Sequence, residues 1–257
     1  MASPIVSPDM RMVKRSGECL GVLIEEGLDG DDMQATIDDT TFRQELMRFW
    51  KSRGRSITPV TETPSQARAR QIMGQNFHGP DQVMKRFGVW YTEAQLLQLA
   101  DTLPSEEVLR ACKDTHILVA GYPLTGLEIH KRMKQNAYEQ DWYENEDFAR
   151  KTKVRLRWLL LRKTDVPNSR SKAYRKQTAL LDSQEETSIF CEVLFGMNLH
   201  FAETGERLHE TYCVRCQDVI SNGDRVYVGH FGQSGWYVDD GGDGDRNSDI
   251  GLASSRN

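Results

Sequence analysis

The sequence lacks a long hydrophobic run. Among its 257 residues, no apolar stretch approaches the roughly 18 residues that a membrane-spanning helix needs. The first residues, MASPIVSPDMRMVKRSGE, also lack the apolar core of a secretory signal peptide. We therefore expect a soluble, cytoplasmic protein with neither a membrane span nor a standard export signal.

The sequence also lacks the regularly spaced cysteines of a disulfide framework. Its five cysteines are scattered along most of the chain, which favours reduced thiols in the cytoplasm. They are Cys19, Cys112, Cys191, Cys213 and Cys216.

The last two cysteines form a CxxC pair, which leaves a zinc protein as one alternative. His209 stands four residues before Cys213, and Cys191 or His200 could supply a fourth ligand. However, the residues between Cys213 and Cys216 are strand-like and include no glycine, so the two thiols should point to opposite faces of a strand. We favour two ordinary strand cysteines and predict no metal ligands.

A recognisable catalytic motif is missing as well. Gly121 and Gly126 are spaced as in a phosphate-binding loop, but Leu127 and Glu128 stand where that loop needs Lys and Ser or Thr. The six histidines are isolated, and no Ser-His-Asp or Cys-His arrangement can be singled out. The sequence indicates no catalytic residues and no cofactor, and it favours a protein that is not an enzyme.

An overall excess of positive charge is also absent. The net charge of −5 and the pI of about 5.7 argue against a protein covered in nucleic acid. Two basic segments, 43–70 and 168–176, keep a nucleic-acid-associated protein as a second alternative. Because most charge runs are simply solvated surfaces, that interpretation is the one we favour for both segments.

What the sequence does contain is the pattern of an α+β protein in three parts. We predict a flexible, partly helical arm and linker over 1–66, because residues 52–66 are rich in Ser, Thr, Pro and Gly. A mainly helical module with one strand-turn-helix unit should follow over 67–150. An α+β domain over 151–257 should carry a small antiparallel sheet near its C-terminal end.

Helix starts are the clearest local signals. We expect short helices over 65–73, from Pro80 and from Ser105, because these residues are favoured at helix starts. Two capping boxes, Thr92 with Gln95 and Thr125 with Glu128, mark two further helix starts.

Two more elements are expected in the second half of the chain. Alternating side chains over 154–163 predict a strand. The strongest helical pattern begins at Ser183, where Glu186 completes a capping box, and ends at Gly205.

Short strand candidates and an acidic loop close the sequence. The strand candidates are TYCVRC, RVYVGHF, GWYV and IGLA. The loop between the last two could gather Ca²⁺ ligands, but Ser248 replaces the glycine of an EF-hand loop, and Arg246 replaces an aspartate of a calcium-binding nonapeptide repeat. We predict a solvated loop on a strand scaffold, which is typical of a contact surface.

The same stretch resembles a known fold. RVYVGHF, Ser234-Gly235-Trp236, the polar loop and Asp249-Ile250-Gly251-Leu252-Ala253 resemble the end of C-type-lectin-like domains of the formylglycine-generating-enzyme type. Variable proteins of diversity-generating retroelements also use that fold. Other stretches, DTHILVAGYPLT, LRKTDVPNSRSK and GDRVYVGHF, resemble a group of uncharacterised bacterial proteins.

The lectin-like resemblance implies a binding function. In those families, the polar positions before the last strand form the ligand-binding face. Carried over to this sequence, that face would lie in the loop 232–249 and would contact a protein or a small ligand. Its residues would be Trp236, Tyr237, Asp239, Asp240, Asp243, Asp245, Arg246, Asn247 and Asp249.

Overall fold

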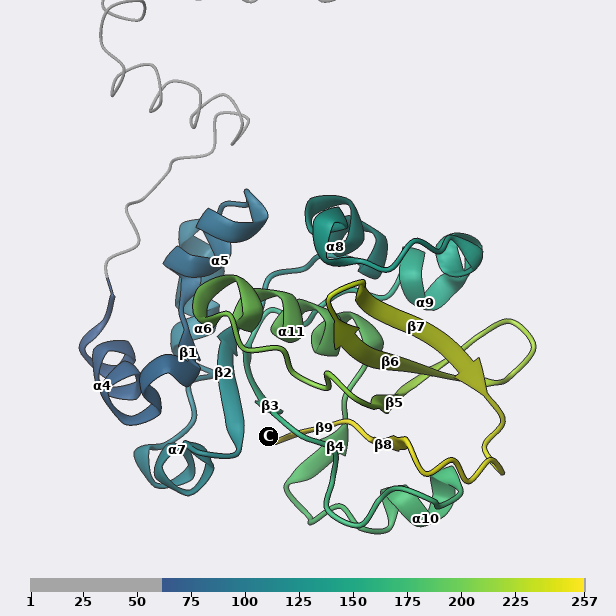
Figure 1. Ribbon diagram of the computed structural model, residues 1–257. Coiled ribbons are helices and arrows are strands. Elements are labelled where there is room, and N and C mark those ends of the chain that lie inside the picture. The colour runs from purple at the N-terminus through teal and green to yellow at the C-terminus, as the bar shows by residue number, and fades with distance from the viewer. Residues whose placement is uncertain (1–61, 257) are drawn as a thin grey trace, which may run out of the picture. The chain divides into compact units, whose positions relative to one another are not determined.

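The computed structural model describes residues 62–256, and Thr58–Asn257 form one compact unit. Most of the predicted arm and linker over 1–66 and most of the basic segment 43–70 lie outside the described residues, although residues 64–66 of the linker belong to a helix. The α+β class is confirmed, because helices surround two small sheets (Figure 1). No helix within 62–256 has the length and apolar character to cross a bilayer.

The first sheet has five strands in the order β1-β2-β3-β9-β4. The strands are β1 (Phe77–His78), β2 (His116–Ala120), β3 (Trp158–Arg162), β9 (Ser254–Arg256) and β4 (Glu185–Thr187). β1 runs parallel to β2, and the other pairs are antiparallel. This sheet takes strands from both sides of the boundary expected near residue 150, so that boundary does not separate two compact units.

The second sheet has four strands in the order β7-β6-β5-β8. The strands are β7 (Gly235–Gly241), β6 (Arg225–Gly232), β5 (Cys213–Val219) and β8 (Ile250–Leu252). All four strand candidates from the sequence are found. β8 is parallel to β5, whereas the remaining pairs are antiparallel.

Five short helices begin within one or two residues of the predicted starts. They are α4 (Pro64–Met73), α5 (Pro80–Phe87), α6 (Glu93–Ala100), α7 (Glu106–Cys112) and α8 (Gly126–Arg132). A further short helix, α9 (Asp147–Arg150), has no side-chain cap. Short 3₁₀ turns lie at η1 (Gly74–Asn76), η2 (Lys134–Asn136) and η3 (Trp142–Asn145). The boxes Thr92–Gln95 and Thr125–Glu128 both form as reciprocal hydrogen bonds.

The central helix is α11 (Phe190–Thr204), which contacts strands of both sheets. It ends at Gly205 as predicted, but it starts seven residues later than the Ser183 signal. The expected first turn is instead strand β4, paired with β9. The helix is capped from a distance, since the Asp218 carboxylate on β5 accepts a 2.6 Å hydrogen bond from the Phe190 N–H.

Strand β3 is shorter and more buried than its alternating pattern suggests. Residues 154–157 precede the strand, and Trp158 to Leu161 are all buried. Gly196 of α11 packs directly on this strand, because a Cβ there would lie 2.5 Å from the Leu161 Cδ1 atom. β3 therefore has a covered face on each side.

Gly121, just after β2, provides a test of this packing. Its N–H donates to the Arg157 carbonyl at 2.9 Å, and an added Cβ would stand 2.7 Å from that same oxygen. We expect Gly121→Ala to lower the free energy of unfolding by about 3 kcal/mol, as overpacking against backbone does. Urea denaturation measures this loss. Gly244→Ala, which meets nothing within 4 Å, is the control and should change stability by less than about 0.5 kcal/mol.

Candidate functional site

The nine residues predicted for ligand contact fall into two groups. Trp236, Tyr237, Asp239 and Asp240 lie within strand β7, whereas the other five lie in the exposed loop 242–249 that follows it. Trp236 and Tyr237, at the start of the strand, are about 15–20 Å from the loop, whereas Asp239 and Asp240 lie at the loop end. The nine residues therefore do not all share one loop surface.

Trp236 does not belong to any exposed surface. Its side chain is fully buried and packs edge-on against His130, with 5.4 Å between the ring centroids. The reason is strand alternation, which turns Trp236 and Val238 towards the core and Tyr237 and Asp239 the other way. The exposed position expected for Trp236 is therefore wrong, and Trp236 does not contribute to a surface on this face.

Tyr237 and Asp239 lie together on the outward face of β7. The Asp239 carboxylate accepts hydrogen bonds from the hydroxyls of Tyr237 at 2.8 Å and Tyr227 at 3.1 Å. The hydrogen bond that Tyr237 donates to Asp239, together with burial, raises the pKa of Tyr237 to about 12, so its hydroxyl stays protonated and keeps donating. The neighbouring Asp240 is half-buried, and burial raises the pKa of its carboxyl group.

The segment after α8 lies along the edge of β7. Ala137 forms a parallel bridge with Trp236, and the Tyr138 N–H donates to the Trp236 carbonyl at 3.0 Å. Gly235, with a φ of 99°, makes this approach sterically feasible, because a Cβ would stand 2.6 Å from the Tyr138 nitrogen. A glycine in GWYV thus positions a segment almost 100 residues earlier in the chain.

This segment walls a groove that the sequence did not indicate. The groove has a volume of about 600 Å³, within the range of small-molecule sites. We call it the 130–144 groove. Its lining residues are His130, Lys134, Ala137, Tyr138, Glu139, Gln140, Asp141 and Glu144.

Partly exposed aromatic rings border the groove. Tyr138 is 45% exposed, and its ring meets that of Tyr237 edge-on at 5.9 Å between centroids. Trp142, next to the lining residue Asp141, is 37% exposed and donates from its indole nitrogen to the Val238 carbonyl at 3.2 Å. Two predicted contact residues have rings that meet lining residues: Tyr237 meets Tyr138 at the border, and the buried Trp236 meets His130 from behind.

The groove carries an excess of negative charge. Glu139, Asp141 and Glu144 contribute three carboxylates, whereas Lys134 contributes one ammonium group. Within residues 62–256, none of these four side chains has a hydrogen bond or an ion pair. The carboxylates are therefore free to meet a ligand.

His130 has a fixed orientation at the inner wall. Its Nδ1 atom lies 2.9 Å from the Tyr143 hydroxyl. Because burial raises the pKa of the Tyr143 phenol far above its usual value, the hydroxyl donates and the imidazole carries its own proton on Nε2. Burial lowers the pKa of His130, which is therefore neutral at pH 7.

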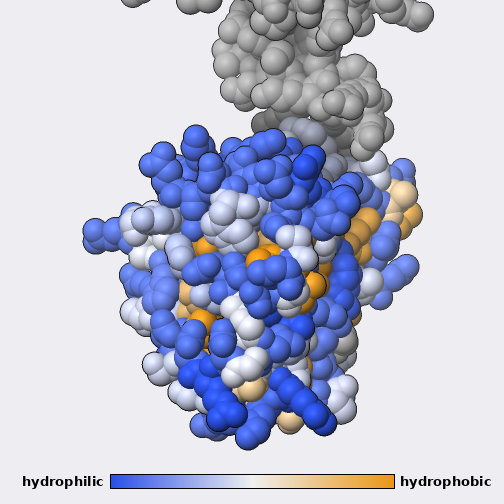
Figure 2. Space-filling model, turned by 90° about the vertical axis from the view of Figure 1, so that its right-hand side faces the viewer, coloured by the Kyte–Doolittle hydropathy of each residue, from blue (hydrophilic) through white to orange (hydrophobic). Residues whose placement is uncertain are grey.

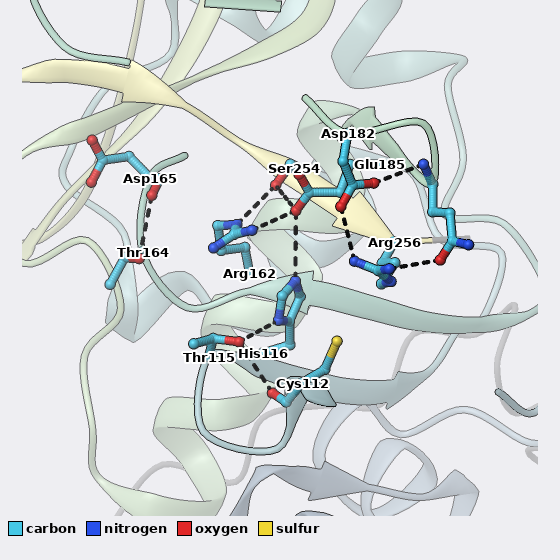
Figure 3. Close-up of polar contacts among 11 residues, drawn as sticks. Cys112, Thr115, His116, Arg162, Thr164, Asp165, Asp182, Glu185, Ser254 and Arg256 are labelled. Atoms are coloured by element: carbon cyan, nitrogen blue, oxygen red, sulfur yellow. Dashed lines mark hydrogen bonds and ion pairs between the residues drawn. The ribbon is translucent and has the colours of Figure 1, made fainter. Parts of the chain in front are cut away.

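A second polar cluster lies inside the five-stranded sheet (Figure 3). The Glu185 carboxylate accepts from Arg162 at 2.6 Å and from Ser254 at 3.4 Å, and it lies 4.0 Å from the His116 Nε2 atom. Although serine, histidine and glutamate are present, both Ser254 and His116 face the carboxylate instead of each other. Among the described residues, no imidazole nitrogen is hydrogen-bonded to the Ser254 hydroxyl to take its proton, so the cluster holds β2, β3, β4 and β9 together.

A small cavity adjoins this cluster. It is lined in part by Arg162, Ser254 and His209 and offers about 10 Å³, the space of about one water molecule. A substrate could not enter there, which supports a structural role for the cluster.

A third cluster is a chain of hydrogen bonds that runs from the buried His78 and His200 to the exposed Glu206. His78 lies 2.9 Å from His200, which lies 3.0 Å from the Glu206 carboxylate, and Lys163 donates to that carboxylate at 2.8 Å. The chain joins β1, α11 and the end of β3. Burial lowers the pKa of His78 to about 3 and also lowers that of His200.

The CxxC pair lacks the surroundings of a zinc site within the described residues. Cys213 and Cys216 are both buried on β5, where strand alternation turns them to opposite faces. Burial raises the pKa of Cys213 to about 12 and also raises that of Cys216 well above its usual value, so neither thiol ionises readily. Over residues 62–256, no group of three or more His, Cys, Asp or Glu residues could hold a metal ion.

The buried histidines predict that acid destabilises the protein. Burial lowers the pKa of His116 and His209 to about 4 and that of His78 to about 3, below the value of about 6.5 in an unfolded chain. The unfolded state therefore binds more protons between pH 6.5 and 4, and stability falls as the pH drops through this range. Each histidine contributes up to about 1.4 kcal/mol per pH unit.

Urea denaturation at pH 7.5, 6.5, 5.5 and 5.0 measures this slope. His116→Gln should make the slope shallower by about one proton. His230→Gln is the matched control, because that side chain is 43% exposed and its ion pair with Asp249 lies at the surface, and it should change the slope less than His116→Gln does. Constant stability between pH 7.5 and 5.0 in the unmodified protein would contradict the prediction.

Comparisons with known proteins do not assign the chain to a family. No family model, no curated protein and no solved structure matches the chain. The C-type-lectin-like resemblance stays a prediction.

Proposed function

We propose that the protein is a binding protein whose ligand is a small organic cation held in the 130–144 groove. The observation that carries the proposal is the pairing of three free carboxylates with partly exposed aromatic rings around one groove. Carboxylates attract a cation through its charge, and aromatic faces attract it through their quadrupole. A ligand with both amine groups and methylene groups suits this lining.

This proposal modifies the hypothesis of a contact surface in the loop 232–249. Tyr237 is retained, since its ring meets Tyr138 at the border of the groove. Trp236 takes an indirect part, because it packs against His130 behind the lining. Residues 242–249 lie at the far end of β7 and are not part of the proposed groove site.

Spermidine is a suitable probe, because its three amines can meet three carboxylates. We expect calorimetric binding to the full chain, and no binding of uncharged triethylene glycol. The double variant Glu139→Gln with Glu144→Gln should weaken binding about 10-fold, since two partly exposed charge pairs contribute up to about 1 kcal/mol each. Tyr138→Ala should weaken it about 3-fold through the lost cation–π contact.

The control is the double variant Asp114→Asn with Glu210→Gln. Both carboxylates are exposed, lie outside the groove lining and have no hydrogen bond or ion pair among the described residues. This variant has the same net charge as the groove variant. Equal weakening by both variants would mean that spermidine responds to overall charge, and the proposal would fail.

A further inference from the structure

The second group of predicted residues, in the loop 242–249, lies beside the basic segment 168–176. The Ser171 N–H donates to the Asn247 carbonyl at 2.9 Å, and the Tyr174 N–H donates to the Asp243 carbonyl at 2.9 Å. The short helix α10 (Tyr174–Thr178) begins within this contact (Figure 1). Two stretches about 70 residues apart therefore form one surface, with Arg246 next to the start of the basic segment.

Buried hydrogen bonds hold the backbone of the basic segment in place. The buried Gln177 side chain donates to the carbonyls of Ser169 at 3.0 Å and Ile250 at 3.2 Å. The Ser169 hydroxyl in turn accepts from the Leu252 N–H at 3.0 Å. A surface held this firmly loses little backbone entropy when a partner binds.

The acidic residues of this region interact with arginines other than the outermost exposed cations. Asp243 pairs with Arg225 at 2.7 Å, and Asp165 pairs with Arg170 at 2.9 Å. Burial lowers the pKa of the fully buried Arg215, and the charge of Asp245 partly opposes that effect. These carboxylates therefore do little to neutralise the outermost cations.

Four outward cations remain without such a partner. None of them has an ion pair or a side-chain hydrogen bond within residues 62–256. Arg175, Lys176 and Arg246 are exposed, and Lys172 is half-buried. We call them the α10 basic surface: Lys172, Arg175, Lys176 and Arg246. In the view of Figure 2, the deepest blue gathers at the foot of the molecule, the level at which Figure 1 draws α10.

Two tyrosines border the same surface. The Arg225 guanidinium lies 3.7 Å from the Tyr174 ring centroid, and the Arg170 guanidinium lies 3.9 Å from that of Tyr212. Both tyrosines are half-buried. Partly exposed rings next to cations are the elements with which proteins bind single-stranded nucleic acids, through stacked bases and neutralised phosphates.

We propose that the α10 basic surface binds the backbone of a single-stranded nucleic acid. The cations follow one another along a segment and its neighbouring loop, which suits the repeated charges of a strand better than one isolated phosphate. The other basic segment is a poorer candidate where it is described, because Arg68 pairs with Glu106 and Arg70 pairs with Glu62. This site is separate from the 130–144 groove.

The test is the salt dependence of binding to a fluorescent 20-nucleotide oligo-U, measured by anisotropy on the full chain. Each phosphate neutralised on a single strand contributes about 0.7 to the slope of log affinity against log salt. Removing four contacts by Lys172→Gln, Arg175→Gln, Lys176→Gln and Arg246→Gln should therefore reduce the slope by about 3. Affinity at 50 mM NaCl should fall at least 10-fold.

A control with the same charge change is Lys85→Gln, Lys113→Gln, Lys131→Gln and Arg150→Gln. These cations are exposed on other elements and have no ion pair among the described residues. This control should keep the slope of the unmodified protein, and both variants should keep its melting temperature. Binding that is absent at 50 mM NaCl, or reduced equally in both variants, would overturn the proposal. Tighter binding of heparin or of a multiply phosphorylated peptide would assign the surface to another polyanion.

Discussion

Pairing of residues 250–256 with both sheets is the constraint on which the fold depends. β8 lies parallel to β5 in one sheet, and after a single intervening residue β9 enters the other sheet between β3 and β4. Ala253 spans the junction, since its N–H donates to the Arg215 carbonyl at 3.0 Å and its carbonyl accepts from Ser188 at 3.3 Å. Without this segment, β4 would lose its strand partner and the two sheets would lose a direct covalent link.

The two proposed sites also depend on backbone pairing more than on side-chain motifs. The groove exists because a segment after α8 bonds to the edge of β7 at Gly235. The α10 basic surface exists because 171–174 bonds to 243–247. In each case, chemistry-bearing residues from distant parts of the chain come together at one end of the same strand, and the two ends differ in the sign of their free charges.

Signals confined to a few residues were sufficient for much of the fold. Capping residues such as Thr92 and Thr125 located helix starts, because the groups they satisfy lie within the next turn. The same reasoning misplaced the start of α11, because residues 185–187 pair with β9 as strand β4. The side chain that caps the helix, Asp218, lies 28 residues after Phe190 in the sequence. Strand β9, with the sequence SSR, has no apolar pattern and could not be predicted from periodicity.

The candidate site was less predictable for a related reason. Strand alternation predicts that Trp236 and Tyr237 face opposite sides of β7. Which side is buried depends on tertiary packing, because Trp236 is covered by His130 of α8. The free carboxylates at 139–144 stand in a stretch with aromatic and acidic character, which by itself is typical of any solvated turn. Only the bridge between Ala137 and Trp236 makes them the wall of a groove.

The position of β9 has a consequence for folding kinetics. Leu160 pairs with Arg256, almost 100 residues further along the chain, so the five-stranded sheet has many contacts of high sequence separation. Closing such a loop costs entropy before its contacts can stabilise the sheet, and proteins with high contact order fold slowly. The capped helices and the strand pairs β5-β6-β7 can form early from local contacts, whereas neither sheet is complete before the same short segment is added. A nascent chain that ends before residue 250 would therefore leave β5 and β3 with open edges and β4 without a strand partner.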